Sequence, residues 1–186
     1  MIAMDTVPYF YALSENYGAP DEDYLTLYEQ GRLTLEAKSI YEALWDNGPL
    51  DTVALRKAVR MTSRESDAWF NRALAGLQSD FKILPVGVTQ AGAWRYAFAY
   101  DVVARHYPEL PERARFIGDV EARKELVKKY FLSVGAAQMR DVSKLFQWKS
   151  NMLVKTIDDL VASDILVREQ ESANNADRWL VLADLV

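Results

Sequence analysis

Cysteine is absent from the 186-residue chain, and histidine occurs once, at position 106. The lack of cysteine excludes disulfides, thiolate zinc sites and cysteine nucleophiles, and it fits a reducing, cytoplasmic location. A single histidine excludes a two-histidine metal site. His106 lies beside Tyr107 and Pro108 in a connecting segment, without a serine in a nucleophile-elbow sequence, so a surface or capping role is expected. We therefore predict no catalytic residue, no metal and no cofactor.

Other signatures are also missing. The sequence contains no glycine-rich loop of the kind that cradles phosphates, so a nucleotide-dependent enzyme has no support. No apolar run approaches about twenty residues, the length that a membrane-spanning helix needs. The first residues carry the acidic Asp5 where a secretion signal would carry basic side chains. We expect neither secretion nor a membrane partner.

Basic side chains are scarce only in the N-terminal segment. The whole chain has a net charge of -5, and residues 1–33 contain a single basic side chain, Arg32. Six acidic side chains accompany it: Asp5, Glu15, Asp21, Glu22, Asp23 and Glu29. The remainder of the chain is nearly balanced, so the acidity is a property of this segment. The same segment is rich in tyrosine, which predicts an irregular or helical strap on the following domain.

A pattern of elements occurs twice in the rest of the chain. An amphipathic helix, a glycine, a short helix, a longer helix and two strand-like runs follow one another. The first helices carry apolar stripes with one spacing, and Gly48 and Gly135 end them. Second apolar sets follow at Leu55, Ala58 and Val59 and at Val142, Leu145 and Phe146. This order is typical of a winged helix-turn-helix. We predict a mainly α protein with small β-hairpins (α+β), built as tandem winged helix-turn-helix domains.

Local signals place the elements of the first copy. Thr34 predicts a helix over 35–47, Asp51 caps a short helix to Arg60, and Thr62 with Glu65 forms a capping-box spacing that opens a helix to Ser79. Strands follow over 83–88 and 94–100. The second copy has helices over 119–133, 139–146 and 150–162, then a hairpin of 165–170 with 178–182. The predicted domains are the strap 1–33, a first winged helix 34–107, a linker 108–118 and a second winged helix 119–186.

The return strand of the first hairpin alternates aromatic with small or basic residues. Trp94, Tyr96, Phe98 and Tyr100 share one face, and period two is a strand signal. Packing of this face against helices or a partner domain is the first interpretation, and stacking on nucleobases is the second.

DNA contacts, if they occur, are expected from the start of each third helix, which enters the major groove in this class of domain. In the second copy these residues could contact base edges and phosphates, and they are Lys149, Ser150, Asn151 and Lys155, flanked by Arg140 and Lys144. In the first copy the candidates are Arg64, Asn71 and Arg72, with Glu65 and Asp67 opposing phosphate approach. The second copy is the stronger candidate. Ordinary exposed polar residues would give the same pattern.

The chain resembles the winged-helix portion of the AlkZ/YcaQ family over about residues 34–182. The residues that carry the resemblance begin with Ile40, Tyr41, Leu44, Gly48, Pro49, Leu50, Leu55 and Arg56. A second run comprises Phe70, Ala73, Leu74, Leu77, Gln78, Phe81, Ile83, Val86, Gly87, Trp94, Tyr96 and Phe98. Members of that family are bacterial DNA glycosylases that unhook alkylated bases and interstrand crosslinks, with tandem winged helices and a C-terminal β-barrel.

The catalytic equipment of that family is not expected here. Its signature is a glutamine, an apolar residue and a glutamine, and no two glutamines of this sequence have that spacing. The second hairpin leaves no chain for a barrel. The resemblance therefore implies an AlkZ-related, glycosylase-like protein without glycosylase residues.

Three functions follow from the sequence. The first is a non-enzymatic protein of DNA repair or regulation that binds duplex DNA through its winged helices. The second is a protein-interaction adaptor, which the acidic, aromatic N-terminus favours. The third and weakest is a glycosylase-like enzyme with an unrecognised site. The sequence does not define the oligomeric state.

Overall fold

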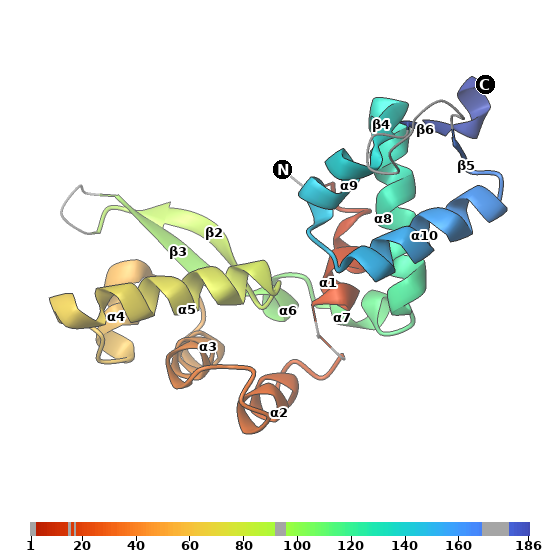
Figure 1. The fold of residues 1–186 in the computed structure, drawn as a ribbon. Helices are drawn as coiled ribbons and strands as arrows, with labels where there is room; N and C mark the ends of the chain where they lie inside the picture. The colour runs from red at the N-terminus through yellow and green to blue at the C-terminus, as the bar shows by residue number, and fades with distance from the viewer. Residues whose placement is uncertain (1–2, 15, 17, 92–95, 169–178) are drawn as a thin grey trace. The chain divides into compact units, whose positions relative to one another are not determined.

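The protein is mainly helical and carries two small antiparallel sheets, as Figure 1 shows. The structure is a computed structural model that describes residues 3–14, 16, 18–91, 96–168 and 179–186. The chain divides into two compact units, Met1–Ile117 and Gly118–Val186. The predicted fold class, helices with small β-hairpins, is confirmed at this level.

The first unit opens with two short helices and then forms a helical group with a three-stranded sheet. Its elements are α1 (Val7–Leu13), α2 (Asp23–Glu29), α3 (Leu35–Asn47), β1 (Leu50–Asp51), α4 (Thr52–Ala58), the 3-10 turn Arg64–Ser66, α5 (Asp67–Ser79), β2 (Ile83–Thr89), β3 (Ala97–Val102), α6 (Val103–His106) and α7 (Glu109–Ala114). The sheet has the order β1-β3-β2, with both pairs antiparallel.

The second unit has a similar order of elements. It contains α8 (Asp119–Val134), β4 (Ala136–Gln138), α9 (Met139–Phe146), α10 (Ser150–Ala162), β5 (Leu166–Arg168), β6 (Trp179–Leu182) and a 3-10 turn, Ala183–Leu185. Its sheet has the order β4-β6-β5 and is also antiparallel. From α3 to β3 and from α8 to β6, both units run helix, strand, helix, helix, strand and strand.

Left-handed backbone conformations recur at matching places in the two units. Gly48 and Gly135 follow α3 and α8 with φ of 80° and 75°. Arg60 and Gln147 have φ of 57° and 52° in the turns before α5 and α10. Phe81 and Asp164, at 53° and 55°, precede β2 and β5. Residues other than glycine rarely adopt this backbone conformation, so the shared positions indicate the same chain path in both units.

Side-chain caps fix the starts of α3 and α4. The Thr34 hydroxyl accepts a hydrogen bond from the Ala37 amide, and the Asp51 carboxylate accepts bonds from the Val53 and Ala54 amides. Both predicted caps are confirmed. Thr89 of β2 also donates to Asp51 at 3.0 Å, which ties the hairpin to the start of α4. These hydrogen bonds to the carboxylate, led by the Ala54 amide, lower the pKa of Asp51 below its ordinary value.

The predicted capping box of Thr62 and Glu65 is wrong by one residue. Ser63 is the capping residue, and its hydroxyl accepts a bond from the Ser66 amide at 3.3 Å. A 3-10 turn then precedes α5, which ends at Ser79 as predicted. Neighbouring Ser and Thr residues both favour caps, so spacing alone did not separate them.

The core of the first unit includes the N-terminal segment. Leu27 and Leu33 lie in the same buried cluster as Ile40, Leu44 and Leu77. Tyr11 of α1 packs in a second cluster, with Val103, Leu110 and Ala114. The segment 1–33 therefore contributes two short helices and buried side chains to the packed interior. The expected connector after β3 is also helical, because α6 and α7 occupy it.

The core of the second unit comes from one face of each helix. Val127, Phe131, Val142, Leu153 and Ile157 are all buried in a single cluster. Leu145 was predicted to share this face, but it is 54% exposed. Ala58, its counterpart in the first unit, is exposed as well. In these apolar sets, Leu55 and Val142 are fully buried, and Val59 and Phe146 are partly buried against the same cores.

The aromatic face of β3 is buried only at its base. Tyr100 joins the core, whereas Phe98 is 43% and Tyr96 is 50% exposed. The three rings form edge contacts at 5.2 and 6.4 Å. Ala97 and Ala99, on the opposite face, are buried. Packing against helices therefore explains Tyr100 but not the two outer rings. Trp94 and Arg95 of the predicted strand, and the predicted turn over 172–177, lie outside the described residues.

Candidate nucleic-acid interface

The third helix of the second unit, α10, is oriented by its apolar face. Leu153, Ile157 and Leu160 are buried in the core, while Ser150, Asn151 and Lys155 are exposed. Asn151 and Lys155 are four residues apart and so lie on one face of the helix. Lys149 is the N-cap residue of α10 and makes no side-chain capping bond. The four predicted contacts at the start of this helix therefore lie together on the exposed side.

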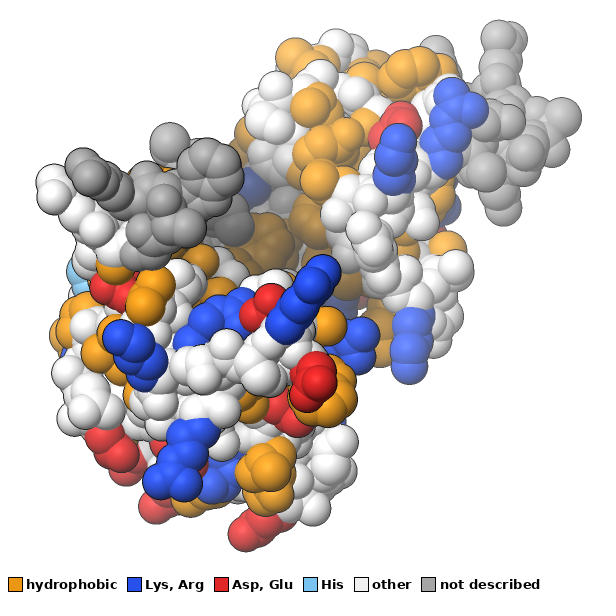
Figure 2. All heavy atoms as spheres, turned by 90° about the vertical axis from the view of Figure 1, so that its left-hand side faces the viewer, with side chains coloured by type: hydrophobic (Ala, Val, Ile, Leu, Met, Phe, Trp, Pro, Cys, Tyr) orange, Lys and Arg blue, Asp and Glu red, His pale blue; other side chains and the backbone are white. Residues whose placement is uncertain are grey.

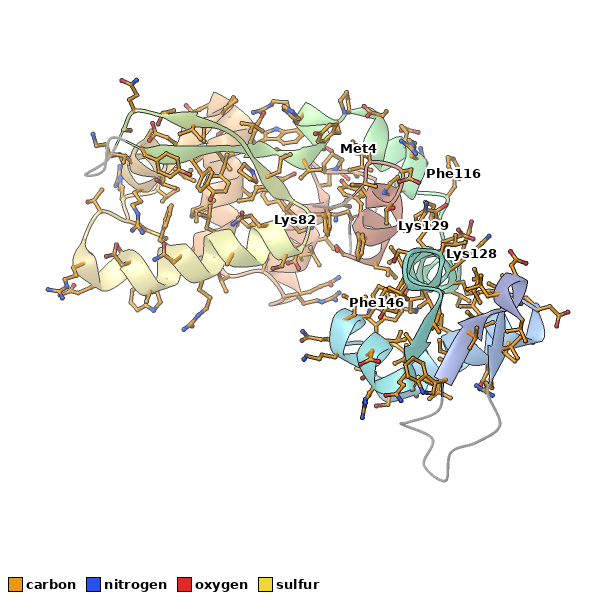
Figure 3. All side chains as sticks on the ribbon, turned by 90° about the horizontal axis from the view of Figure 1, so that it is seen from above. Met4, Lys82, Phe116, Lys128, Lys129 and Phe146 are labelled. Atoms are coloured by element: carbon orange, nitrogen blue, oxygen red, sulfur yellow. The ribbon has the colours of Figure 1, made fainter. Side chains whose placement is uncertain are left out.

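A compact turn fixes the start of α10 relative to α9. The Phe146 and Trp148 rings stack with centroids 4.4 Å apart, and Phe146 also meets Tyr130 of α8 edge-on. Figure 3 labels Phe146 at the end of α9. Gln147, between the stacked residues, takes the left-handed conformation that reverses the chain. The aromatic contacts hold the exposed residues of α10 on a rigid support.

The start of α9 places two further cations on the surface. The Asp141 carboxylate accepts a hydrogen bond from the Gln138 amide at 3.1 Å in a reciprocal capping box. Asp141 is the one acidic side chain of α9, and this contact engages it in capping the start of the helix. Arg140 and Lys144 are exposed, four residues apart on the same helix.

Basic side chains of this region are available for an outside ligand. Within the described part of the chain, Lys144, Lys149 and Lys155 make no ion pair and no side-chain hydrogen bond. Arg140 does have an interaction within the protein. Three uncommitted ammonium groups on α9, the turn and α10 form a modestly positive surface.

An ion pair reduces the negative charge beside this surface. Asp158 lies one turn beyond Lys155 on α10 and would repel a phosphate. Arg168 of β5 forms a hydrogen-bonded ion pair with the Asp158 carboxylate. The sequence did not reveal this pair, because the two residues belong to different elements that only the fold brings together. Arg168 thereby belongs to the candidate surface as the residue that neutralises its acid.

Apolar side chains are interspersed among these cations. Leu145 of α9 is 54% exposed, and Val154 of α10 is 45% exposed. Exposed apolar residues beside lysines fit contact with a protein as well as with DNA. The composition of the surface alone therefore leaves both kinds of partner open.

The first unit holds its corresponding residues differently. Arg56 of α4 pairs with Asp67 at 2.7 Å, donates to the Asn71 side-chain oxygen at 3.1 Å, and covers the Phe70 ring at 4.0 Å. Asn71, one of the predicted DNA contacts, is thus engaged within the protein. These contacts join the two helices and explain why Asp67 and Asn71 occur where base-reading residues were expected.

Arg64 and Arg72 of the first unit are exposed, and acidic side chains lie near both. Arg64 lies beside the exposed acid Glu65, and Arg72, about two helical turns further along the chain, lines a pocket together with Glu36 and Asp80. In Figure 2, basic and acidic side chains are intermixed on the surface nearest the viewer. The mixed charge makes the first unit the weaker candidate for phosphate contact.

The side chains of the described residues form no candidate metal site. Their histidine and carboxylate side chains nowhere gather in a group of three that could hold a metal ion. None of their helices combines the length and apolar character that crossing a membrane requires. His106 is exposed and makes an edge contact with Tyr107, with ring centroids 4.8 Å apart.

The AlkZ-related family matches residues 1–147. The matched stretch covers more than half of the chain, so this protein belongs to the AlkZ-related family. It begins at the N-terminal segment, earlier than the resemblance read from the sequence, and ends at Gln147, before α10. No curated protein and no solved structure shows detectable similarity to the chain. Membership relates the chain to a glycosylase-like, DNA-associated family, and the matched residues do not include α10.

Proposed function

We propose that the protein is a non-enzymatic, tandem winged-helix protein that binds duplex DNA, in repair or regulation. The proposal rests on the exposed start of α10. Asn151, Lys149 and Lys155 lie there, next to the aromatic turn that joins α9 to α10. The repeated order of elements and the sheet order shared by both units support the winged-helix assignment. Family membership supports DNA as the ligand.

The chemistry of each residue suits a role in the complex. In a winged helix the third helix enters the major groove with its first turn against the base edges. Asn151 offers an amide that can bond an adenine edge at two points. Lys149, Lys155 and Lys144 supply ammonium groups for phosphates on either side of the groove. Ser150 can bond a phosphate or a base.

A salt titration tests the proposal. Duplex DNA binding is measured by fluorescence anisotropy at several salt concentrations, and each phosphate neutralised adds roughly one unit to the slope of log K against log salt. We expect the double variant Lys149→Glu/Lys155→Glu to reduce the slope by about two units. Lys57→Glu/Arg60→Glu makes the same charge change on the first unit and should leave most of the slope intact.

Two results would overturn the proposal. The first is an absence of duplex binding at low salt. The second is an equal loss in both double variants, which would show that net charge and not the α10 surface governs binding.

A protein partner is the second candidate function. The exposed Leu145 and Val154 favour it, because apolar side chains at the centre of a surface are typical of protein contacts. Replacement of both residues by serine should then abolish partner binding while the salt slope for DNA stays unchanged.

Catalysis is not part of the proposal. Gln78 donates to the Leu74 carbonyl within α5, and Gln138 belongs to the capping box of α9, so both side chains have structural contacts. Incubation with alkylated duplex DNA should yield no abasic sites. Reproducible base release that follows the protein through purification would refute this part.

A further inference from the structure

A pocket of about 250 Å³ lies within the first unit, and none of its lining residues belongs to the α10 surface of the second unit. One wall is the outer face of α5, and the other is the chain that leads into α3, from Arg32 to Ala37. Ala73 and Gly76 have small or no side chains, so this part of the α5 wall leaves open space. A Cβ atom built at Gly76 would meet nothing within 4 Å. The volume falls below the roughly 300–1,000 Å³ of sites for drug-sized ligands, so the pocket can enclose one ring system while the rest of a ligand lies at its rim.

The rim of the pocket carries an uncovered indole. Trp69 is 57% exposed, although tryptophan is the largest apolar side chain. No aromatic ring or guanidinium within the described ranges stacks on it. Trp69, Ala73 and Gly76 lie on one face of α5 at helical spacing, and all three line the pocket. A planar ligand in the pocket can stack on this ring.

Charged groups flank the indole on both walls. Arg72 lines the pocket and makes no ion pair or side-chain hydrogen bond with any described residue. Arg32 supplies a second guanidinium from the opposite wall. Glu36 and Asp80 also line the pocket, so its formal charge is balanced. Guanidinium groups bind phosphate through paired hydrogen bonds, and the carboxylates can accept bonds from amino groups. The balance favours one phosphate over a polyphosphate chain.

We propose that this pocket binds a single nucleotide unit, with its base stacked on Trp69 and its phosphate at Arg72. The unit comes either from a free nucleoside monophosphate or from an unpaired nucleotide at a DNA end. The proposal is independent of duplex binding, since it uses no residue of the second unit.

Calorimetric titration with adenosine monophosphate, and anisotropy with a duplex bearing a short single-stranded overhang, distinguish the two sources. A blunt duplex of the same sequence reports ordinary duplex binding. Stacking of one base contributes enough that Trp69→Ala should weaken binding by about tenfold or more. Trp69→Phe should retain most of the affinity, and Arg72→Gln should lower affinity for the monophosphate but not for adenosine.

Matched variants control for general effects. Trp179→Ala removes another half-exposed tryptophan, from the second unit, and Arg60→Gln removes another exposed arginine of the first unit. Both should bind as the wild type does. Binding of the free monophosphate that is weakened in Trp69→Ala and Arg72→Gln, but not in the two control variants, identifies a nucleotide pocket. Preference for the overhang over the blunt duplex, lost in the same variant, identifies an unpaired DNA nucleotide.

The proposal is overturned if neither ligand binds, if Trp69→Ala binds as well as the wild type, or if adenosine binds as tightly as its monophosphate. Binding of the blunt duplex, sensitive to Lys149 and Lys155, is unaffected by any of these outcomes. Failure of the pocket and failure of duplex binding therefore give different results.

Discussion

The side-chain nitrogen of Lys82 donates a hydrogen bond to Oδ1 of Asn16 at 2.9 Å. The two residues are 66 positions apart in the sequence, and both are buried. Asn16 in turn donates to the backbone oxygens of Asp80 at 2.9 Å and Tyr11 at 3.3 Å. Figure 3 shows Lys82 beyond the end of α5. One amide side chain thus fastens the N-terminal segment to the junction of α5 and β2.

Replacement of Asn16 by alanine should destabilise the protein by about 1–3 kcal/mol, because a buried ammonium group loses its hydrogen-bond acceptor. Lys82→Met removes the charge while it keeps an apolar stem, so it should cost less. Urea denaturation of both variants measures the difference. A smaller loss in Asn16→Ala than in Lys82→Met would contradict the assignment.

Alkaline pH should act on stability in two opposite steps. Burial lowers the pKa of Lys82 below its ordinary 10.5, so the unfolded state binds more protons there and stability rises with pH toward that value. Burial also raises the pKa of Tyr11 and Tyr41 above their ordinary 10.0. Above pH 10 the folded state therefore binds more protons, and stability falls.

Denaturation midpoints of the wild type and Lys82→Met at a series of pH values test both steps. The rising step should disappear in the variant, whereas the fall above pH 10 should remain. Parallel curves for the two proteins would show that Lys82 titrates as it does in water.

Loss of Arg56 should loosen the contact between α4 and α5. The change Arg56→Gln removes the ion pair to Asp67, the bond to Asn71 and the cation–π contact with Phe70, and we expect a cost of about 1–2 kcal/mol. Arg64→Gln removes an arginine that has no such contacts and should change stability by less than about 0.5 kcal/mol. Thermal unfolding of the two variants gives the comparison, and equal midpoints would contradict it.

Neutralisation of Asp158 by Arg168 can be measured through DNA affinity. Arg168→Gln should weaken duplex binding at low salt, because it leaves the carboxylate uncompensated beside Lys155. The double variant with Asp158→Asn should recover the loss. If Arg168→Gln and the double variant bind equally weakly, Arg168 contacts the phosphate directly.

The N-terminal acids should weaken DNA binding through long-range repulsion. Asp21, Glu22 and Glu29 are exposed and can be changed to their amides without disturbing the core. We expect tighter duplex binding at low salt and no difference once salt shortens the screening length to a few ångströms. Asp46→Asn with Glu109→Gln and Glu112→Gln is a control of equal charge. An equal gain in the control would exclude a specific effect of the segment.

Helices with clear caps and apolar stripes were predictable from the sequence. Thr34 and Gly48 bound α3 within a residue, because a cap and a left-handed glycine are local signals. The two N-terminal helices, α1 and α2, were not predicted as separate elements, because they are short and are held by contacts with distant residues. Strand alternation grouped the β3 aromatics correctly, but it could not show that the helices cover only Tyr100.

The candidate surface was predictable in part for the same reason. The exposure of Asn151 and Lys155 follows from helical periodicity, which is local. The pairing of Asp158 with Arg168, and the capture of Asn71 by Arg56, depend on how separate elements pack. No spacing in the sequence encodes those contacts.

The packing of Tyr11 against Val103 and Leu110 has a consequence for how the chain is made. A ribosome synthesises α1 well before its partners in α6 and α7, which emerge only after nearly all of the first unit has been made. Native contacts that wait for a distant partner form late and slow the folding of a domain. Nascent α1 therefore remains without these native neighbours until α7 appears, with its apolar side chains accessible to chaperones.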